Sequence, residues 1–438
     1  MNLKINPLTN GLNGEITAPG SKSYSHRVFI AAGLANGISV IKNPLTTGDV
    51  KITMKILENL GIHIQKENEN TYIVNPNKEE LKSVKKFIDC KNSGTSIRIF
   101  SVLSLLVKGG LALTGEFFQL KRPILPLLKA LQKLGGKFKL KDGILRIKRN
   151  SFSCNKISIR GDISSQFITA LLMICPLLKC KNRDYIEIKL ITPLTSRPFV
   201  EITIDVLNSF GVLIQENFEN NTFYATSVQS YRPQSYTIPG DFSSAAFIIV
   251  AAVLSQFQSN ITINNLSFKN YQGDKKIIDI LHRMGAHIES IENSNKIIIN
   301  SNRFKNPLTG IEIDCLDIPD LFPILSVVGA FAKGKTVLYN ISNLRNKESD
   351  RVSSITSELR KMGVELVEED NKLTIFQCEK LKGIKVNHAN DHRIAMACTV
   401  AALNATSASS IENGEIVNDS YPTFFKDLEE LGVLIEEE

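Results

Sequence analysis

The stretch LHRMGAHI, residues 281–288, decides the fold because its pattern returns along the whole chain. In each copy, Leu-x-x-apolar-Gly is followed by a stretch of alternating apolar residues. The pattern recurs roughly every 75 residues, and its glycines are Gly61, Gly135, Gly211, Gly285, Gly363 and Gly432. Each copy is typical of the last turn of an amphipathic helix, a left-handed glycine after it, and then a strand. Six copies predict a structural repeat.

A second signature lies upstream in each repeat, where a polar cluster opens a strongly apolar segment rich in small residues. The clusters are SKSYSHR (21–27), NSGTSIR (92–98), GDISSQ (161–166), GDFSSA (240–245), PDLF (319–322) and NDHR (390–393). The segments that follow are apolar on every side, so we expect buried helices there, whereas the Leu-x-x-apolar-Gly helices keep a charged face and should lie outside. Each repeat is therefore predicted to be a βαβαββ unit of an α/β protein.

Six repeats divide naturally into two domains of three. A chain of 438 residues is also too long for one core. Matching dipeptides at Pro19–Gly20 and Pro239–Gly240 are the expected crossing points. We expect an inserted domain at 20–239 and a second domain formed by 1–19 and 240–438, with the N-termini of the buried helices facing a cleft between them.

The composition is that of an ordinary globular protein, with 43% hydrophobic and 22% charged residues and a net charge of +8. Apolar runs such as FITALLMICPLL are too short to span a bilayer, and Pro176 breaks this one. The N-terminal MNLKINPLTNG has no apolar core, so no signal peptide is predicted. The seven cysteines form no CxxC and are expected to be reduced in a cytoplasmic protein. The six histidines have no ligand-like spacing, so no metal is expected.

The polar clusters indicate anion binding. A helix N-terminus presents unpaired N–H groups and partial positive charge. Serine, threonine and asparagine are also ordinary caps, which would explain any single cluster. Caps do not explain Lys22, Arg27, Arg98 and Arg393, because cations at a helix N-terminus oppose the dipole.

Seven motifs, taken in order, give the chain a resemblance to a known family. They are APGSKSYSHR (18–27), NSGTSIR (92–98), LTGEFFQLKRPI (113–124), GDISSQFITALLM (161–173), IPDLFPILSVVGAFAKGKT (318–336), NLRNKESDRVSSITSELRKMG (343–363) and NDHRIAMA (390–397). Together they resemble the 5-enolpyruvylshikimate-3-phosphate synthases, within the enolpyruvyl transferases. The resemblance implies two domains of three βαβαββ units. It also implies transfer of the enolpyruvyl group of phosphoenolpyruvate to shikimate 3-phosphate in aromatic amino acid and chorismate biosynthesis.

The same resemblance assigns the site residues. Lys22, Asp320 and Glu348 would be catalytic, with Asp320 beside the 5-hydroxyl of shikimate and Glu348 and Lys22 exchanging protons at carbon. Phosphoenolpyruvate would be held by Lys22, Gly94, Arg122, Arg351 and Arg393. Shikimate 3-phosphate would be held by Ser23, Arg27, Ser164, Ser165, Gln166, Ser196, Asp320, Asn343 and Lys347. The resemblance implies no cofactor, no metal, no nucleic acid and no membrane partner, and we expect a cytoplasmic monomer.

Within NLRNKESDR, the spacing of Val352, Ile355 and Leu359 predicts a helix that begins near residue 347. Lys347 and Arg351 would then lie at i and i+4 on one face. Like charges in that arrangement cost about 0.2–0.5 kcal/mol, which a bound anion would offset.

Two departures from the family pattern leave alternatives open. Asp419, in IVNDSYPTF, stands where relatives carry a lysine that binds phosphoenolpyruvate, and Phe199 stands where many carry a tyrosine that binds the shikimate ring. A weakly active or degenerate relative is one alternative. UDP-N-acetylglucosamine enolpyruvyl transferase is a second, although the loop GGLALTGEFFQLKRPI lacks that enzyme's cysteine. A nucleic-acid binder is a third, disfavoured because basic and aromatic residues are not interleaved and tryptophan is absent.

Overall fold

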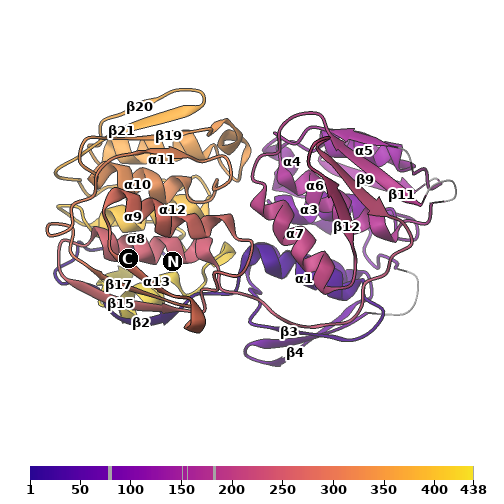
Figure 1. Ribbon diagram of the computed structural model, residues 1–438, viewed down its shortest axis with the longest axis horizontal. Helices are drawn as coiled ribbons and strands as arrows, with labels where there is room; N and C mark the ends of the chain where they lie inside the picture. The colour runs from indigo at the N-terminus through magenta and orange to yellow at the C-terminus, as the bar shows by residue number, and fades with distance from the viewer. Residues whose placement is uncertain (77–80, 150, 155, 181–183, 438) are drawn as a thin grey trace. The chain divides into compact units, whose positions relative to one another are not determined.

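The computed structural model describes residues 1–76, 81–149, 151–154, 156–180 and 184–437. The chain forms two compact units (Figure 1). Unit 1 comprises Met1–Ser21 and Pro239–Glu438, and unit 2 comprises Lys22–Ile238. Within the described ranges, no helix combines the length and apolarity needed to cross a membrane.

Both units are built from four-stranded sheets that share one topology. In each sheet one edge strand is parallel to its neighbour, and each of the other two strands is antiparallel to the strand before it, as in β18-β19-β21-β20. The chain order within such a repeat is strand, helix, strand, helix and hairpin. The α/β fold with βαβαββ repeats, predicted from the glycine pattern, is confirmed.

Unit 2 holds three of these sheets with their helices. In spatial order the first has β14 (Ser235–Thr237), β3 (Ser39–Lys42), β5 (Thr71–Asn75) and β4 (His63–Asn68), with α1 (Lys22–Gly33) and α2 (Gly48–Asn59). The second has β6 (Ile88–Asp89), β7 (Leu111–Thr114), β9 (Ile144–Arg149) and β8 (Gly136–Lys141), with α3 (Gly94–Leu103), α4 (Glu116–Gln119) and α5 (Leu125–Lys133). The third has β10 (Ile157–Ile159), β11 (Tyr185–Leu190), β13 (Thr222–Thr226) and β12 (Ile214–Asn217), with α6 (Ser165–Ile174), η1 (Cys175–Leu177) and α7 (Pro198–Ser209).

Unit 1 repeats the plan. Its first sheet has β16 (Ile288–Ile291), β17 (Lys296–Ser301), β15 (Ser259–Asn264) and β2 (Asn13–Thr17), with α8 (Phe242–Leu254), η2 (Gly273–Lys275), α9 (Lys276–Met284) and η3 (Glu292–Ser294). The second has β18 (Glu312–Asp314), β19 (Lys335–Tyr339), β21 (Lys372–Phe376) and β20 (Leu366–Glu368), with α10 (Phe322–Phe331), η4 (Ser342–Asn346) and α11 (Arg351–Lys361). The third has β22 (Lys385–Val386), β23 (Ser409–Ile411), β1 (Leu3–Ile5) and β24 (Ile435–Glu437), with α12 (His392–Ala402), η5 (Gly414–Asp419) and α13 (Phe424–Glu430).

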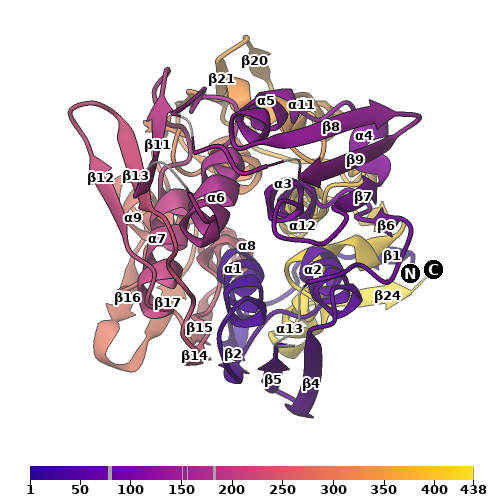
Figure 2. The same ribbon diagram turned by 90° about the vertical axis from the view of Figure 1, so that its right-hand side faces the viewer.

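Strands from distant parts of the chain complete three of the sheets. β14 pairs with β3, β2 pairs with β15, and β1 lies between β23 and β24. The last pairing places Leu3 opposite Glu437, so the two chain ends lie side by side (Figure 2). The first and last strands of the chain therefore fix one repeat of unit 1 together.

The helices divide into two kinds, as the sequence predicts. Every residue of α8, α10 and α12 is buried, and these three helices pack against one another inside unit 1. α9, in contrast, buries only one face. The six repeat glycines all follow the second helix of a repeat with φ between 79° and 108°, a conformation that favours glycine.

Two short segments of unit 1 pair where the chain passes between the units. Gly20 and Gly240 form an antiparallel bridge, flanked by hydrogen bonds from Ser21 N to Pro239 O and from Asp241 N to Pro19 O, each 2.8 Å. A Cβ on Gly240 would lie 2.0 Å from a backbone oxygen, so only glycine fits there.

The predicted helix start near residue 347 is wrong. α11 begins at Arg351, and the Asp350 side chain caps it by accepting from Ser353 N at 3.1 Å. Lys347 is extended, with φ −88° and ψ −150°. Lys347 and Arg351 therefore do not stack on one helical face, and the like-charge cost expected for that arrangement does not arise.

The expectation that all seven cysteines are reduced is also wrong. Cys154 and Cys180 form a disulfide, while the other five cysteines are free. Cys154 precedes β10 and Cys180 precedes β11, and these strands are parallel neighbours. Parallel strands begin at the same edge of a sheet, so residues 26 positions apart come together without a short sequence motif.

Cys154→Ser should lower the free energy of unfolding by about 3 kcal/mol without reductant, because the bond closes a loop of some 26 residues. Urea unfolding with and without dithiothreitol measures this. Cys378→Ser, which changes a free and partly exposed thiol, is the control and should match the wild type. Equal urea midpoints for Cys154→Ser and the wild type without reductant would contradict the prediction.

Candidate functional site

In unit 2 the predicted site residues gather at the starts of buried helices. Lys22 is the first residue of α1, Gly94 of α3 and Ser165 of α6. Ser93 caps α3 by accepting from Ser96 N, and Ser164 caps α6 by accepting from Gln166 N. The serines of these clusters therefore cap helices, as the capping explanation predicts. Capping does not explain the lysine and arginines beside them.

Two guanidinium groups converge on Gly94. A Cβ built there would lie 2.9 Å from Arg122 Nη2 and 2.9 Å from Arg98 Nη1. Arg122 donates to the backbone and side-chain oxygens of Asn92 at 2.6 and 2.9 Å, and Arg98 donates to Gln166 Oε1. Gln166 in turn donates to Thr95. The structure thus brings together Gly94, Arg122 and Gln166, with Arg98 as the group that links them.

Aromatic rings support these cations from behind. Arg98 lies 5.1 Å from the Phe117 ring and 5.3 Å from the Phe167 ring, and Arg122 lies 5.3 Å from Phe117. Both arginines are less than a tenth exposed. Such contacts stabilise a desolvated cation, so aromatic rings of the core help to hold the charge at Gly94 in place.

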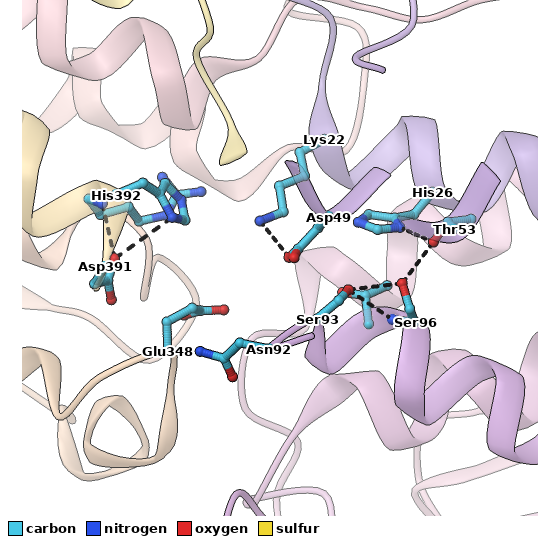
Figure 3. A network of polar contacts seen from close by, with 12 residues as sticks. Lys22, His26, Asp49, Thr53, Asn92, Ser93, Ser96, Glu348, Asp391 and His392 are labelled. Atoms are coloured by element: carbon cyan, nitrogen blue, oxygen red, sulfur yellow. Dashed lines mark hydrogen bonds and ion pairs between the residues drawn. The ribbon is translucent and has the colours of Figure 1, made fainter. Parts of the chain in front are cut away.

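Lys22 is paired within unit 2. Its Nζ lies 2.8 Å from Asp49 Oδ2, and both side chains are mostly buried (Figure 3). Asp49 lies in the first turn of α2, so the ion pair joins the starts of two helices. Sequence reasoning missed Asp49, although an acid in the first turn of a helix is favoured by the helix dipole.

Arg27 is held by neutral acceptors. It donates to Thr203 Oγ1, Ser23 O, Thr169 Oγ1 and Phe199 O at 2.7–3.1 Å. Burial lowers the pKa of its guanidinium to about 10. The residue thus ties α1 to α6 and α7, and it brings positive charge into the unit without an ion-pair partner among these contacts.

The predicted serines of the third repeat lie on neighbouring loops. Ser164 caps α6 and Ser165 begins it, and Thr195 N donates to Gly161 O in the loop before the helix at 3.2 Å. Ser196 follows with φ 55°, a left-handed conformation uncommon for serine, and is almost fully buried. These residues therefore form a second polar group in unit 2.

In unit 1 a single buried arginine organises the predicted residues. Arg351 donates to Asp320 Oδ1 at 2.7 Å, to Glu348 Oε2 at 2.8 Å and to Asp391 Oδ2 at 2.8 Å. Burial lowers the pKa of the guanidinium, but the three carboxylates outweigh burial and raise that pKa above its usual value. Arg351 is therefore a fixed cation whose hydrogen bonds hold two of the predicted catalytic acids in place.

Arg393 differs from Arg351 because some of its N–H donors make no hydrogen bond with the described residues. Its Nη2 lies 3.0 Å from Asp320 Oδ2, whereas its buried Nε and Nη1 have no hydrogen-bond partner in the described chain. Burial alone would raise the pKa of the Asp320 carboxyl, but Arg393, Arg351 and Lys347 hold that pKa well below its ordinary value. Asp320 is thus an anion, and Arg393 can bind a further acceptor.

The remaining predicted residues of unit 1 lie near this cluster in the chain. Asn343 belongs to η4, and its buried Oδ1 has no hydrogen-bond partner among the described residues. Lys347 and Glu348 follow in the bend between η4 and α11. Asp419 is the last residue of η5 and is partly exposed.

Two further buried acids in unit 1 were missed by sequence reasoning. Asp241 caps α8 through Ser244, and Asp274 accepts a hydrogen bond from Ser243. Burial and the negative charge of Asp320 raise the pKa of Asp274 to about 7, and burial raises that of Asp241. The cluster GDFSSA was the available signal for Asp241, because aspartate favours a helix cap, whereas Asp274 lies within η2 and caps neither η2 nor α9.

Each unit can therefore bind anions. Unit 2 offers two buried arginines at a glycine where a helix begins, and unit 1 offers a buried arginine with two unpaired donors beside a fixed carboxylate. Carboxylates and a lysine at such places can also move protons, provided that their pKa values suit the reaction.

Comparisons with known proteins agree with this chemistry. A family profile described as EPSP synthase (3-phosphoshikimate 1-carboxyvinyltransferase) matches residues 8–428. A curated relative named 3-phosphoshikimate 1-carboxyvinyltransferase, from Methanocaldococcus jannaschii, is 42% identical, covering 100% of both chains. A relative of the same name from Methanococcus maripaludis is also 42% identical, covering 97% of each.

Two solved structures share the fold. The EPSP synthase of Acinetobacter baumannii superposes with a TM-score of 0.80 at 23% identity, covering 99% of both chains. The enolpyruvyl transferase NikO of Streptomyces tendae superposes with a TM-score of 0.78 at 19% identity, covering 99% of this chain and 98% of its own. Fold, buried anion-binding groups and full-length identity agree, and the chain belongs to the EPSP synthase (3-phosphoshikimate 1-carboxyvinyltransferase) family.

Proposed function

We propose that the chain transfers the enolpyruvyl group of phosphoenolpyruvate to the 5-hydroxyl of shikimate 3-phosphate and releases inorganic phosphate. The observation that carries this proposal is the match, along the entire chain, to relatives named for that activity. The buried cations of both units support it, because both substrates are polyanions.

The reaction is an addition followed by an elimination. Phosphoenolpyruvate gains a proton at its methylene carbon while the 5-hydroxyl loses its proton and adds to the neighbouring carbon. The tetrahedral ketal then loses phosphate from that carbon and a proton from the methyl group, which restores the double bond. Glu348 and Lys22 exchange the proton at carbon. Asp320 acts as the base that takes the proton of the 5-hydroxyl. Charged groups fixed before the reaction stabilise the developing charge without reorganising.

Phosphoenolpyruvate would be bound by residues of two chemical kinds. Lys22, Arg122, Arg351 and Arg393 supply positive charge, and Gly94 supplies a backbone N–H at a helix start with no side chain in the way. Arg393 carries the strongest structural support, since two of its buried nitrogen atoms have no partner within the described residues.

Shikimate 3-phosphate would be bound by Ser23, Arg27, Ser164, Ser165, Gln166, Ser196, Asp320, Asn343 and Lys347. Hydroxyl and N–H groups at the start of α6 suit a phosphate dianion. Arg27 already makes four hydrogen bonds within unit 2. We therefore propose that it acts on the shikimate carboxylate mainly through its charge.

Weak activity, caused by Asp419, is the second candidate. The substitution puts a carboxylate where the family resemblance places a cation. We also propose that the chain, of 48.6 kDa, acts as a monomer in the cytoplasm.

Release of inorganic phosphate from phosphoenolpyruvate and shikimate 3-phosphate tests the proposed function. We expect release to require both substrates. UDP-N-acetylglucosamine, offered in place of shikimate 3-phosphate, should give none. Release with the nucleotide sugar alone would favour the other enolpyruvyl transferase, and no release with either acceptor would favour a degenerate relative.

Glu348→Gln and Asp320→Asn should each lower kcat by about 10²–10⁴-fold, the usual effect of losing a positioned acid or base. Binding of shikimate 3-phosphate, followed by calorimetry, should change much less. Glu358→Gln is a matched control, because Glu358 is a buried acid of α11 that pairs with Lys361 outside the cluster. This control should lower stability and spare kcat. Turnover close to that of the wild type would remove the varied residue from the catalytic set.

Asp419→Lys should improve the use of phosphoenolpyruvate. If Asp419 faces that substrate, the lysine replaces repulsion by a charge-assisted hydrogen bond of about 1.5–3 kcal/mol, which is roughly 10- to 100-fold in kcat/KM. Glu415→Lys, a charge reversal at an exposed residue of the same 3-10 helix, should change kcat/KM little. Steady-state kinetics that give both variants the same kcat/KM, within twofold, would place Asp419 outside the site.

A further inference from the structure

A chain of buried side-chain hydrogen bonds crosses the core of unit 2 (Figure 3). His26 Nδ1 lies 2.8 Å from Thr53 Oγ1, which lies 2.9 Å from Ser96 Oγ, which lies 2.9 Å from Ser93 Oγ. All four residues are at most 1% exposed. Because apolar residues could fill this space, the presence of four linked polar groups calls for a functional reason.

This series of hydrogen bonds connects α1, α2 and α3, whose first turns carry or adjoin the proposed phosphoenolpyruvate contacts. His26 is on α1, one turn after Lys22, and Thr53 is on α2, one turn after Asp49. The Lys22–Asp49 ion pair and the His26–Thr53 hydrogen bond are thus successive rungs between the same two helices. The His26–Thr53 hydrogen bond, one turn further along both helices, therefore fixes the spacing and rotation of the helix starts that carry the ion pair.

The other end of this hydrogen-bond series lies at the start of α3. Ser93 caps this helix by accepting from Ser96 N at 3.3 Å, and Gly94, the first helical residue, lies between these two serines. Through Ser96, Thr53 therefore fixes the position of the helix whose first N–H is proposed to meet phosphoenolpyruvate.

The protonation state of His26 fits a positioning role. Burial lowers the pKa of its ring to about 3, an effect that Asp49 opposes and that Lys22 and Arg27 strengthen. The ring is therefore neutral, and Nδ1 can share one proton with Thr53. Nε2 is buried and has no hydrogen-bond partner in the described part of the chain, so the ring is anchored by Thr53 alone.

We propose that His26, Thr53, Ser96 and Ser93 form a positioning network that sets Lys22 relative to Gly94 for phosphoenolpyruvate. This inference rests on the proposed function, in which Lys22 and Gly94 contact that substrate. The four residues act through the helices they join and touch no substrate themselves. Shikimate 3-phosphate depends less on them, because Ser164, Ser165 and Ser196 lie at the start of α6 and before α7, whereas Ser23 and Arg27 are its proposed contacts on α1.

The test compares isosteric and conservative changes in the full-length protein. Thr53→Val removes the central hydroxyl at constant shape, Thr53→Ser keeps it, and Ser96→Ala cuts the network at its next member. Ser101→Ala is the matched control, since Ser101 is equally buried on α3 and donates only to Ile97 O of its own helix. KM for each substrate, kcat and the midpoint of thermal unfolding are measured for all variants.

Thr53→Val and Ser96→Ala should raise KM for phosphoenolpyruvate about three- to tenfold, the effect of one buried hydrogen bond, and change KM for shikimate 3-phosphate less than twofold. Thr53→Ser and Ser101→Ala should stay within twofold of the wild type for both. The double variant Thr53→Val, Ser96→Ala should be no worse than the larger single change, because both cut the same chain of bonds.

The network is overturned if Thr53→Val leaves KM for phosphoenolpyruvate unchanged, or if it changes both KM values equally in step with lost thermal stability. If Thr53→Val fails to fold, the KM values of Ser96→Ala test the network in its place. A wild-type protein that releases no phosphate overturns the proposed function, whereas an active wild type with unmoved variants overturns the network alone.

Discussion

A helix that is apolar on every face can lie only inside a shell of other elements, and the whole architecture follows from that requirement. In unit 1, every residue of α8, α10 and α12 is buried, so the three sheets and the outer helices must enclose them. The backbone N–H groups of such helices that lack partners within the helix are confined to the helix starts. Three βαβαββ repeats therefore bring several helix starts together within each compact unit. Polar and charged side chains can enter the core at these starts.

The two units carry buried charge in different ways. In unit 1 Arg351 is saturated by three carboxylates, as a cation in a low-dielectric interior must be if its desolvation is to be offset. In unit 2 Arg98 and Arg122 rest on the rings of Phe117 and Phe167 and donate to neutral oxygens. Unit 1 thus holds its acids in a fixed array around Arg351, while aromatic rings support the buried arginines of unit 2.

Much of this could be predicted from sequence, and the failures have physical causes. The repeat was visible because each copy needs glycine at a left-handed position, as the φ of 108° at Gly285 illustrates. The start of α11 was misplaced by four residues, because apolar spacing fixes a helix's buried face and leaves its first residue to a cap, here Asp350. The disulfide was missed because the pairing of β10 with β11, and no local motif, brings Cys154 to Cys180. Asp49 and Asp274 were missed because their importance depends on partners distant in the chain.

The pKa of Asp320 constrains how the proposed reaction can proceed. The carboxylate is held between Arg351 and Arg393. It is a weak base, because the two cations stabilise its ionised form over its protonated form. In the proposed function, phosphoenolpyruvate occupies the unpaired donors of Arg393, and its negative charge offsets the field that lowers the pKa of Asp320. Under that proposal, Asp320 would become a stronger base only after the donor substrate has bound. The same arginine would thereby bind one substrate and govern how readily the other loses its proton, which ties acid–base chemistry to occupancy of the site.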